Sequence, residues 1–141
     1  MGHSQPEYYL HLVWATYERE PLLVGETEAI IYACLRAELR HMDCRVLALG
    51  GIADHVHLAV EPTTLLGPAS LMKQIKGVSS RFASSKGIAF KWQAGYGLRC
   101  MGREHLHAAI HYIENQKRHH TDGTLWSEWE PTATELILRS T

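Results

Sequence analysis

Two apolar runs near the middle of the chain, separated by only two residues, constrain the fold more than any other feature. CRVLALGGI covers residues 44–52 and HVHLAVE covers residues 55–61. Both runs are rich in valine, isoleucine and leucine, so each is predicted to form a strand. A link this short lets two strands pair only in the antiparallel sense, because parallel strands need a crossover of about a dozen residues or more. The centre of the chain is therefore predicted to be an antiparallel β-hairpin.

The patterns on either side of this hairpin complete one α+β fold. Outer strands are predicted at residues 8–16 and 97–101, and apolar residues at helical spacing predict helices over 26–42 and 69–85. The order strand, helix, strand, strand, helix, strand is that of a ferredoxin-like βαββαβ antiparallel sheet. A further helix, over residues 104–119, is appended at the C-terminal end of this pattern and carries Tyr112, a candidate catalytic residue.

Length and composition place the chain among soluble globular proteins. At 141 residues it is long enough for one domain with its own core. We expect a single domain over residues 1–141, with its core at about 8–120 and a C-terminal tail at 121–141. No apolar run approaches the roughly 18 residues of a membrane span, and the N-terminus lacks the pattern of a signal peptide. These features predict a cytoplasmic protein with no membrane partner.

Positive charge is concentrated in one part of a chain whose net charge is only −1. Between residues 71 and 103 there are seven lysines and arginines and no acidic residue. A solvated helix face and a basic face that binds nucleic acid are both consistent with such a run. In the second case these side chains contact DNA phosphates, and binding weakens steeply with salt. The candidates for phosphate contacts are Lys73, Lys76, Arg81, Arg99 and Arg103.

Two aromatic residues in the same region also have two interpretations. Trp92 and Tyr96 stand in the glycine-containing stretch WQAGYG. Either ring can stack on an unpaired base, which is worth about 1–3 kcal/mol. A place in the core or at an interface fits each of them equally well.

The second strand of the hairpin carries two histidines, His55 and His57, on either side of one valine. On a strand, residues i and i+2 point to the same face, so the two imidazoles project side by side. Two imidazoles held together form half of a metal site, although a hydrogen-bonded histidine pair at a sheet edge fits the same spacing. Asp54, directly before them, either orients one imidazole or serves the turn.

The last predicted helix supplies groups that could complete a metal site. Tyr112 and Gln116 are four residues apart, so they lie about one turn apart on one helical face. The amide oxygen of Gln116 can be a third ligand, and two imidazoles with a carbonyl oxygen suit Mg²⁺ or Mn²⁺ better than a structural zinc. A phenol beside that cation can act as a covalent nucleophile, whereas an ordinary amphipathic tyrosine also fits. His119 and His120 either approach the site or a DNA phosphate, or lie exposed at the helix end.

Five stretches of the chain together resemble one known family. They are LVWATYEREPLL at 12–23, DHVHLAV at 54–60, LMKQIKGVSSRF at 71–82, WQAGYG at 92–97 and YIENQKRHH at 112–120. In this order and spacing they resemble the single-tyrosine HUH transposases of the IS200/IS605 type, in which U is a bulky apolar residue. The resemblance covers about residues 8–120.

The resemblance implies a metal-dependent DNA transposase. It implies His55, His57 and Gln116 as ligands of Mg²⁺ or Mn²⁺, and Tyr112 as the nucleophile that attacks a phosphodiester in single-stranded DNA. A 5′-phosphotyrosine and a 3′-hydroxyl would form, and the hydroxyl could later rejoin strands. The resemblance also implies DNA hairpins as the substrate, a place in the cytoplasm at the nucleoid, and a homodimer. Its composite sites would pair the histidines of one chain with the tyrosine helix of the other.

Two alternatives to a transposase of a mobile element are consistent with the sequence. One is a domesticated relative that binds or nicks hairpin DNA without mobilising an element. The other is a non-catalytic ferredoxin-like binding module whose histidines hold a structural ion.

Overall fold

The central feature of the structure is one antiparallel sheet. A computed structural model of the chain describes residues 8–62 and 66–125. The four strands lie in the order β2-β3-β1-β4, and every neighbouring pair is antiparallel. The predicted hairpin and the ferredoxin-like βαββαβ arrangement are therefore confirmed. The strands are β1 (Tyr8–Ala15), β2 (Val46–Ile52), β3 (His55–Val60) and β4 (Gly97–Gly102).

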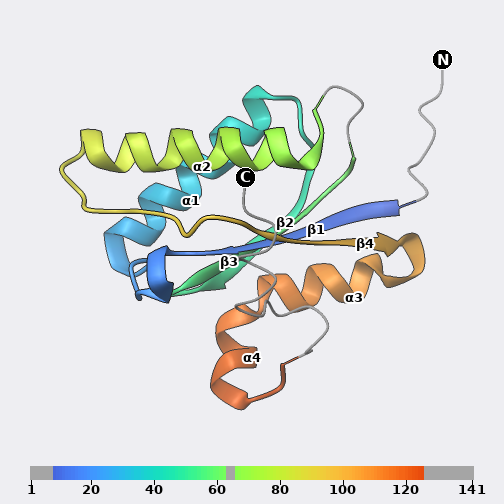
Figure 1. Ribbon diagram of the computed structural model, residues 1–141. Helices are drawn as coiled ribbons and strands as arrows, with labels where there is room; N and C mark the ends of the chain where they lie inside the picture. Colours follow the sequence, from blue (N-terminus) through green and yellow to red (C-terminus); the bar gives the residue numbers. More distant parts are fainter. Residues whose placement is uncertain (1–7, 63–65, 126–141) are drawn as a thin grey trace.

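Helices cover both faces of the sheet (Figure 1). α1 (Gly25–His41) and α2 (Pro68–Ser85) lie on one face, and α3 (Arg103–Glu114) and α4 (Gln116–Asp122) lie on the other. A short 3₁₀ turn, η1 (Tyr17–Arg19), follows β1. None of the helices in the part of the chain that the structure describes has the length and apolar character to cross a membrane. The predicted tail lies outside the described residues from position 126 onward.

Alternation along β3 divides its side chains between the two faces of the sheet. The even-numbered residues of β3 belong to the larger hydrophobic core, together with residues of α1 and α2. Ala59 instead belongs to a smaller cluster with Tyr112 of α3. Because side chains alternate in direction along a strand, His55 and His57 share the face of Ala59. The strand pattern therefore directs both histidines toward α3 and α4.

The helix predicted over 104–119 is broken into two at Asn115. α3 ends at Glu114, and Asn115 has φ −113° and ψ 29°. The backbone N–H and the side-chain Nδ2 of Asn115 both donate to the carbonyl oxygen of His111, at 3.2 and 2.8 Å. An asparagine side chain that bonds the backbone in this way competes with continuation of the helix. The prediction of one continuous helix was wrong for this reason, and Gln116 becomes the first residue of α4.

The end of α3 lies against a glycine of β2 that has no room for a side chain. A Cβ on Gly50 would clash with the carbonyl oxygen of Ile113 and lie 3.2 Å from its carbonyl carbon. We expect Gly50→Ala to push α3 off the sheet, because backbone cannot yield as a flexible side chain can. Overpacking of this kind costs about 1–3 kcal/mol of unfolding free energy, and thermal unfolding followed by circular dichroism measures it. Gly67→Ala is the control, because a Cβ there would meet nothing within 4 Å; equal melting temperatures for the two variants would contradict the prediction.

Candidate active site

Two buried imidazoles lie side by side on β3. His55 and His57 are each 0% exposed, and their ring centroids are 5.1 Å apart with the planes at 64°. β3 lies inside the sheet, between β2 and β1. The two histidines are therefore not at a sheet edge, whereas the alternative to a metal site was a hydrogen-bonded histidine pair at such an edge. Pairing on both sides of β3 holds the two histidines in a fixed register.

The Nδ1 atom of each imidazole makes a short polar contact. Nδ1 of His55 donates to Oδ1 of Asp54 at 2.8 Å, so Asp54 does orient an imidazole. Nδ1 of His57 lies 2.8 Å from Nε2 of His11 in β1. Such contacts fix the tautomer and the orientation of a metal-binding histidine. A cation at this site would therefore be bound through the two Nε2 atoms.

Sequence reasoning missed His11. The signal that could have found it is a histidine inside the otherwise apolar strand YYLHLVWA, which alternates onto the same face as the HxH pair. His11 is 1% exposed, and its ring stacks on that of His57 with the centroids 5.0 Å apart. Only the pairing of β1 with β3 shows that these two histidines meet.

The turn after β1 brings a cation to the carboxylate of Asp54. Nη2 of Arg19 lies 3.3 Å from Oδ1 of Asp54. Glu18 and Arg19 have φ values of 52° and 54°, a left-handed conformation that residues with side chains adopt only where the surroundings hold it. The hydrogen bond from His55, helped by the charge of Arg19, holds the pKa of Asp54 below its usual range in spite of burial. The carboxylate therefore stays ionised beside the histidine at neutral pH.

We expect Asp54→Asn to weaken the binding of Mn²⁺ by about 10- to 100-fold, as mutation of the group that orients a metal-binding histidine commonly does. The amide can still accept a bond from His55 but carries no charge. Titration of the purified chain with Mn²⁺, followed by electron paramagnetic resonance, measures the affinity. Asp43→Asn is the control, since Asp43 is exposed in the turn after α1.

The ionised carboxylate of Asp54 also makes the stability of the fold depend on pH. Because the pKa of Asp54 is lowered on folding, its contribution to stability is present above the unfolded value of about 3.9 and is lost as the pH falls through the folded pKa.

The end of α3 brings a phenol to the same histidines, and the break that follows it places an amide next to that tyrosine. The ring centroid of Tyr112 lies 6.1 Å from that of His57, with the planes at 87°. Nε2 of Gln116 donates to the backbone oxygen of Tyr112 at 3.3 Å. Both side chains are only 1% exposed. The phenol of Tyr112 is therefore closed off from solvent in this structure.

Two histidines of α4 lie against the same group. Nε2 of His120 donates to Oε1 of Gln116 at 3.1 Å, and the ring of His120 lies 5.0 Å from that of His55. The ring of His119 lies 4.7 Å from that of Tyr112. Of the two interpretations of these histidines, the structure favours a place beside the site. The structure thus gathers the sequence candidates for ligand and nucleophile at one site within a single chain.

The described side chains do not form the closed shell of a structural zinc site. Within residues 8–62 and 66–125, no group of three His, Cys, Asp or Glu side chains is arranged to hold an ion. A structural zinc site needs a closed tetrahedral shell, most often of cysteine and histidine. Two imidazoles and the amide oxygen of Gln116 would instead leave positions open for substrate or water, as Mg²⁺ and Mn²⁺ require.

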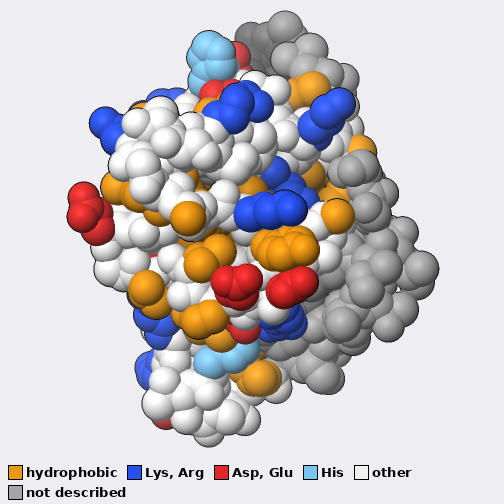
Figure 2. Space-filling view, turned by 60° about the vertical axis from the view of Figure 1, so that its left-hand side comes forward, with side chains coloured by type: hydrophobic (Ala, Val, Ile, Leu, Met, Phe, Trp, Pro, Cys, Tyr) orange, Lys and Arg blue, Asp and Glu red, His pale blue; other side chains and the backbone are white. Residues whose placement is uncertain are grey.

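The basic candidates do not gather at this site. Those of α2 lie on the opposite face of the sheet from the histidines, whereas the other two lie in β4 and at the start of α3. Figure 2 shows lysine and arginine side chains on one face of the molecule with acidic and hydrophobic ones between them. The candidates are Lys73, Lys76 and Arg81 on α2, Arg99 in β4 and Arg103 in α3.

Lys76 differs from the exposed cations of α2. Its Nζ donates to the backbone oxygens of Gln93 and Gly95, at 2.8 and 3.1 Å, and burial lowers its pKa to about 8. These bonds hold the segment that leads into β4. Trp92 and Tyr96 are each 7% exposed and belong to the larger core, so of their two interpretations the structure favours the core.

Comparison with known proteins identifies the family. The family model described as "Transposase IS200 like" matches residues 4–116, most of the chain. The chain belongs to this transposase family. The match contains His55, His57 and Tyr112, and Gln116 is its last residue.

Individual relatives of this transposase-family chain are known. The ISDra2 transposase TnpA of Deinococcus radiodurans is 32% identical over 77 residues, which are 55% of this chain and 54% of that protein. The chain thus matches about half the length of this curated relative. A crystal structure of a candidate transposase from D. radiodurans R1 is 30% identical, with a TM-score of 0.62 over 82% of this chain and 95% of that one.

A second solved structure shows how widely the fold is shared. The structure of a REP-associated tyrosine transposase bound to a REP hairpin has a TM-score of 0.64 and covers 89% of this chain and 76% of that one. At 13% identity this likeness shows the fold alone. The ferredoxin-like arrangement of this transposase-family chain therefore recurs in proteins of very different sequence.

Proposed function

We propose that this transposase-family chain nicks and rejoins single-stranded DNA at the hairpin-bearing ends of a mobile element, with Tyr112 as the nucleophile. The observation that carries the proposal is the position of Tyr112 beside His57, in a site that also holds His55 and Gln116. These residues come from β3 and from the α3–α4 break, which are far apart in the sequence. A buried tyrosine beside two fixed imidazoles is expected for nucleophilic chemistry at a metal-activated phosphate.

The reaction needs no external source of energy. The phenolic oxygen of Tyr112 attacks the phosphorus of a phosphodiester, the bond from phosphorus to the 3′ oxygen breaks, and the proton lost by the phenol is balanced by one gained by the 3′ oxygen. The products are a 5′-phosphotyrosine and a free 3′-hydroxyl. A 3′-hydroxyl can later attack the phosphotyrosine, which restores the phenol and joins two strands.

His55, His57 and Gln116 would hold Mg²⁺ or Mn²⁺. A bound divalent cation would polarise an oxygen of the scissile phosphate and orient the bond for in-line attack. Asp54 and His11 keep the two imidazoles in position, through contacts of 2.8 Å to each Nδ1. His120 holds the amide of Gln116 with its oxygen as the acceptor, so these contacts would hold the three proposed ligands in position for a cation.

The proposed partners are DNA hairpins and a second copy of the chain. A protein of the same fold has been solved with a REP hairpin, which supports hairpin DNA as the substrate. In this structure Tyr112 lies beside the histidines of its own chain, so a composite site in a homodimer would require two chains to exchange α3 and α4. The proposed phosphate contacts outside the site are Lys73, Arg81, Arg99 and Arg103, and those beside it are His119 and His120. The reaction would take place at the nucleoid.

The test uses single-stranded oligonucleotides that cover the DNA on both sides of the gene. The full chain is incubated with them in Mn²⁺, and the products are separated on a denaturing gel. We expect a covalent protein–DNA adduct together with a shorter strand that ends in a 3′-hydroxyl. Nicking without rejoining would favour a domesticated relative. A chain that forms no adduct with any of these strands is a binding module, and the proposal is then wrong.

A further inference from the structure

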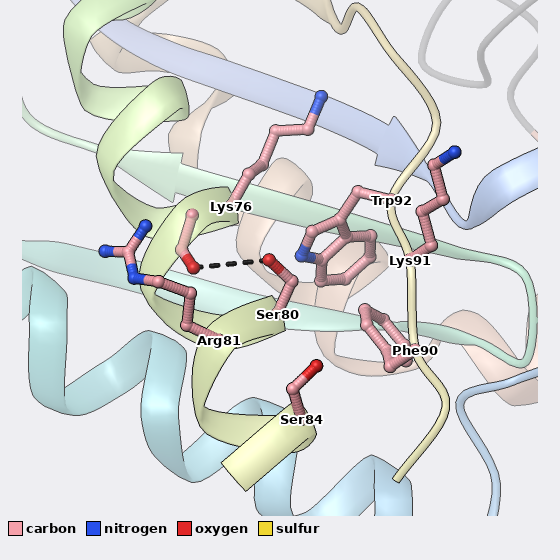
Figure 3. Close-up of a pocket in the computed structure, with 8 residues that line it drawn as sticks. Lys76, Ser80, Arg81, Ser84, Phe90, Lys91 and Trp92 are labelled. Atoms are coloured by element: carbon pink, nitrogen blue, oxygen red, sulfur yellow. Dashed lines mark hydrogen bonds between the residues drawn. The ribbon is translucent and has the colours of Figure 1, made fainter.

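A pocket on the side of α2 has no part in the chemistry described so far. It has a volume of about 460 Å³ and lies between α2 and the segment that precedes β4 (Figure 3). This volume is within the range of pockets that take small ligands. The described residues that line it include Lys76, Arg81 and Lys91 and none that is acidic. Because Nζ of Lys76 is bonded to two backbone carbonyls, Arg81 and Lys91 are the cations proposed to meet a ligand. The pocket therefore favours an anionic ligand.

The side chains around this pocket are of three kinds: cationic, hydroxyl-bearing and aromatic. Figure 3 shows Arg81 and Lys91 on opposite sides, with the hydroxyls of Ser80 and Ser84 and two aromatic rings between them. The rings of Phe90 and Trp92 meet edge to face with their centroids 4.6 Å apart. A nucleotide within a strand has a comparable character, with a phosphate on each side of its sugar and a base whose two planar faces are apolar. We propose that this α2 pocket binds one nucleotide of the single-stranded DNA that flanks the cleaved bond. The proposal deepens the proposed function and rests on it.

A glycine in the middle of α2 supports a binding role for Arg81. Glycine is disfavoured inside a helix, yet Gly77 occupies the fourth position before Arg81, directly beneath its guanidinium. A Cβ at Gly77 would lie 3.0 Å from Nη1 and 3.7 Å from Cζ of Arg81. The missing side chain thus leaves room for the guanidinium to lie against the helix beside the pocket. Lys76 holds the facing wall through its bonds to the segment before β4.

The α2 pocket lies near the end of the sheet that carries the candidate active site. Trp92 of the pocket forms a bridge with Thr16, at the end of β1. Thr16 in turn donates its backbone N–H to the carbonyl oxygen of Asp54 at 3.0 Å. Two strand spacings, about 10 Å, therefore separate the backbone of the pocket from that of the residues before His55. Lys91, whose Nζ lies 4.2 Å from the ring centroid of Tyr17 in η1, stands along this path. A single strand that leaves the active site around this end of the sheet would reach the pocket.

The test compares two DNA probes from the sequence beside the gene: a hairpin with a single-stranded extension, and the same hairpin without it. Affinity is measured by fluorescence anisotropy in a chelator, so that no strand is cut. We expect the extended hairpin to bind more tightly to the wild-type chain. Arg81→Ala and Lys91→Ala should each remove most of this preference, weaken binding of the extended probe about threefold or more, and lower its salt slope by about 0.7.

Two further variants separate the pocket from general charge effects. Arg40→Ala removes an exposed cation of α1 that does not line the pocket, and it should leave the preference for the extension unchanged. Gly77→Ala keeps every charge and crowds the guanidinium of Arg81, so it should reduce the preference by less than Arg81→Ala does. The proposal is overturned if the wild-type chain shows no preference, or if Arg40→Ala reduces it as much as Arg81→Ala does.

The outcome can be told apart from failure of the proposed function. Covalent adduct formation in Mn²⁺ is measured separately on the wild-type chain. If the wild-type chain forms the adduct, and the Arg81 and Lys91 variants keep the wild-type preference for the extended hairpin, the pocket proposal is wrong and the proposed function stands. Loss of the preference in these variants, with no adduct under any condition, supports the pocket as a single-strand site and rejects the nicking chemistry.

Discussion

Tyr112→Phe is expected to abolish the covalent protein–DNA adduct and to lower strand cleavage by more than about a thousandfold, as removal of a covalent nucleophile does in other enzymes. The substitution removes one oxygen and keeps the ring that packs against His57 and His119. The chain should therefore stay folded and bind hairpin DNA with an affinity within about twofold of the wild type. A denaturing gel measures the adduct, and anisotropy in a chelator measures the binding.

Tyr8→Phe is the matched control for this prediction. Tyr8 is 48% exposed at the start of β1, away from the histidine pair, so the same loss of a phenolic oxygen should leave the adduct unchanged. An adduct that persists in Tyr112→Phe would show that another group is the nucleophile. An adduct that is lost equally in both variants would indicate a general effect on the protein.

His57→Ala is expected to remove metal binding and cleavage together. Its imidazole would supply one of only three protein ligands, and loss of a ligand costs more than the 10- to 100-fold that follows from loss of a ligand's hydrogen-bond partner. Mn²⁺ affinity measured by electron paramagnetic resonance should fall by more than about 100-fold, and adduct formation should fall below detection. His55→Ala should behave in the same way, because both imidazoles are fixed through Nδ1.

His107→Ala serves as the control for the histidine variants. His107 is exposed on α3, so its removal takes one imidazole from the chain and none from the site. Metal affinity and adduct formation should both stay at the wild-type level. Cleavage by the wild-type chain that continues in an excess of chelator would falsify the metal role, whatever the histidine variants do.

Much of the fold could be predicted because it depends on local periodicity. The two-residue link between two apolar runs permits only a hairpin, and alternation places His55 and His57 on one face. Neither conclusion needs knowledge of distant parts of the chain. The boundary of the last helix was less predictable. Its break depends on how Asn115 bonds the carbonyl of His111 and on the close approach of Ile113 to Gly50.

The basic residues illustrate the limit of a linear pattern. Seven cations between residues 71 and 103 indicate a possible basic face, but charge along a sequence does not specify direction in space. The structure distributes them over α2, the segment between α2 and β4, β4 and the start of α3. It commits Lys76 to two backbone carbonyls. It joins Arg81 instead with Lys91, Phe90 and Trp92 around one pocket.

The sequence by itself determined the kinds of element, their order and the residue types that could carry the chemistry, because each follows from neighbours along the chain. Only the tertiary structure decided which side chains meet. His11 reaches His57 because the register of β1 on β3 sets Val13 opposite His57 and His11 opposite Ala59, which makes the two histidines diagonal neighbours on one face. Tyr112 reaches the pair because Gly50 lets the end of α3 lie directly on β2. Such contacts depend on strand register and close packing between distant segments, which no local pattern encodes.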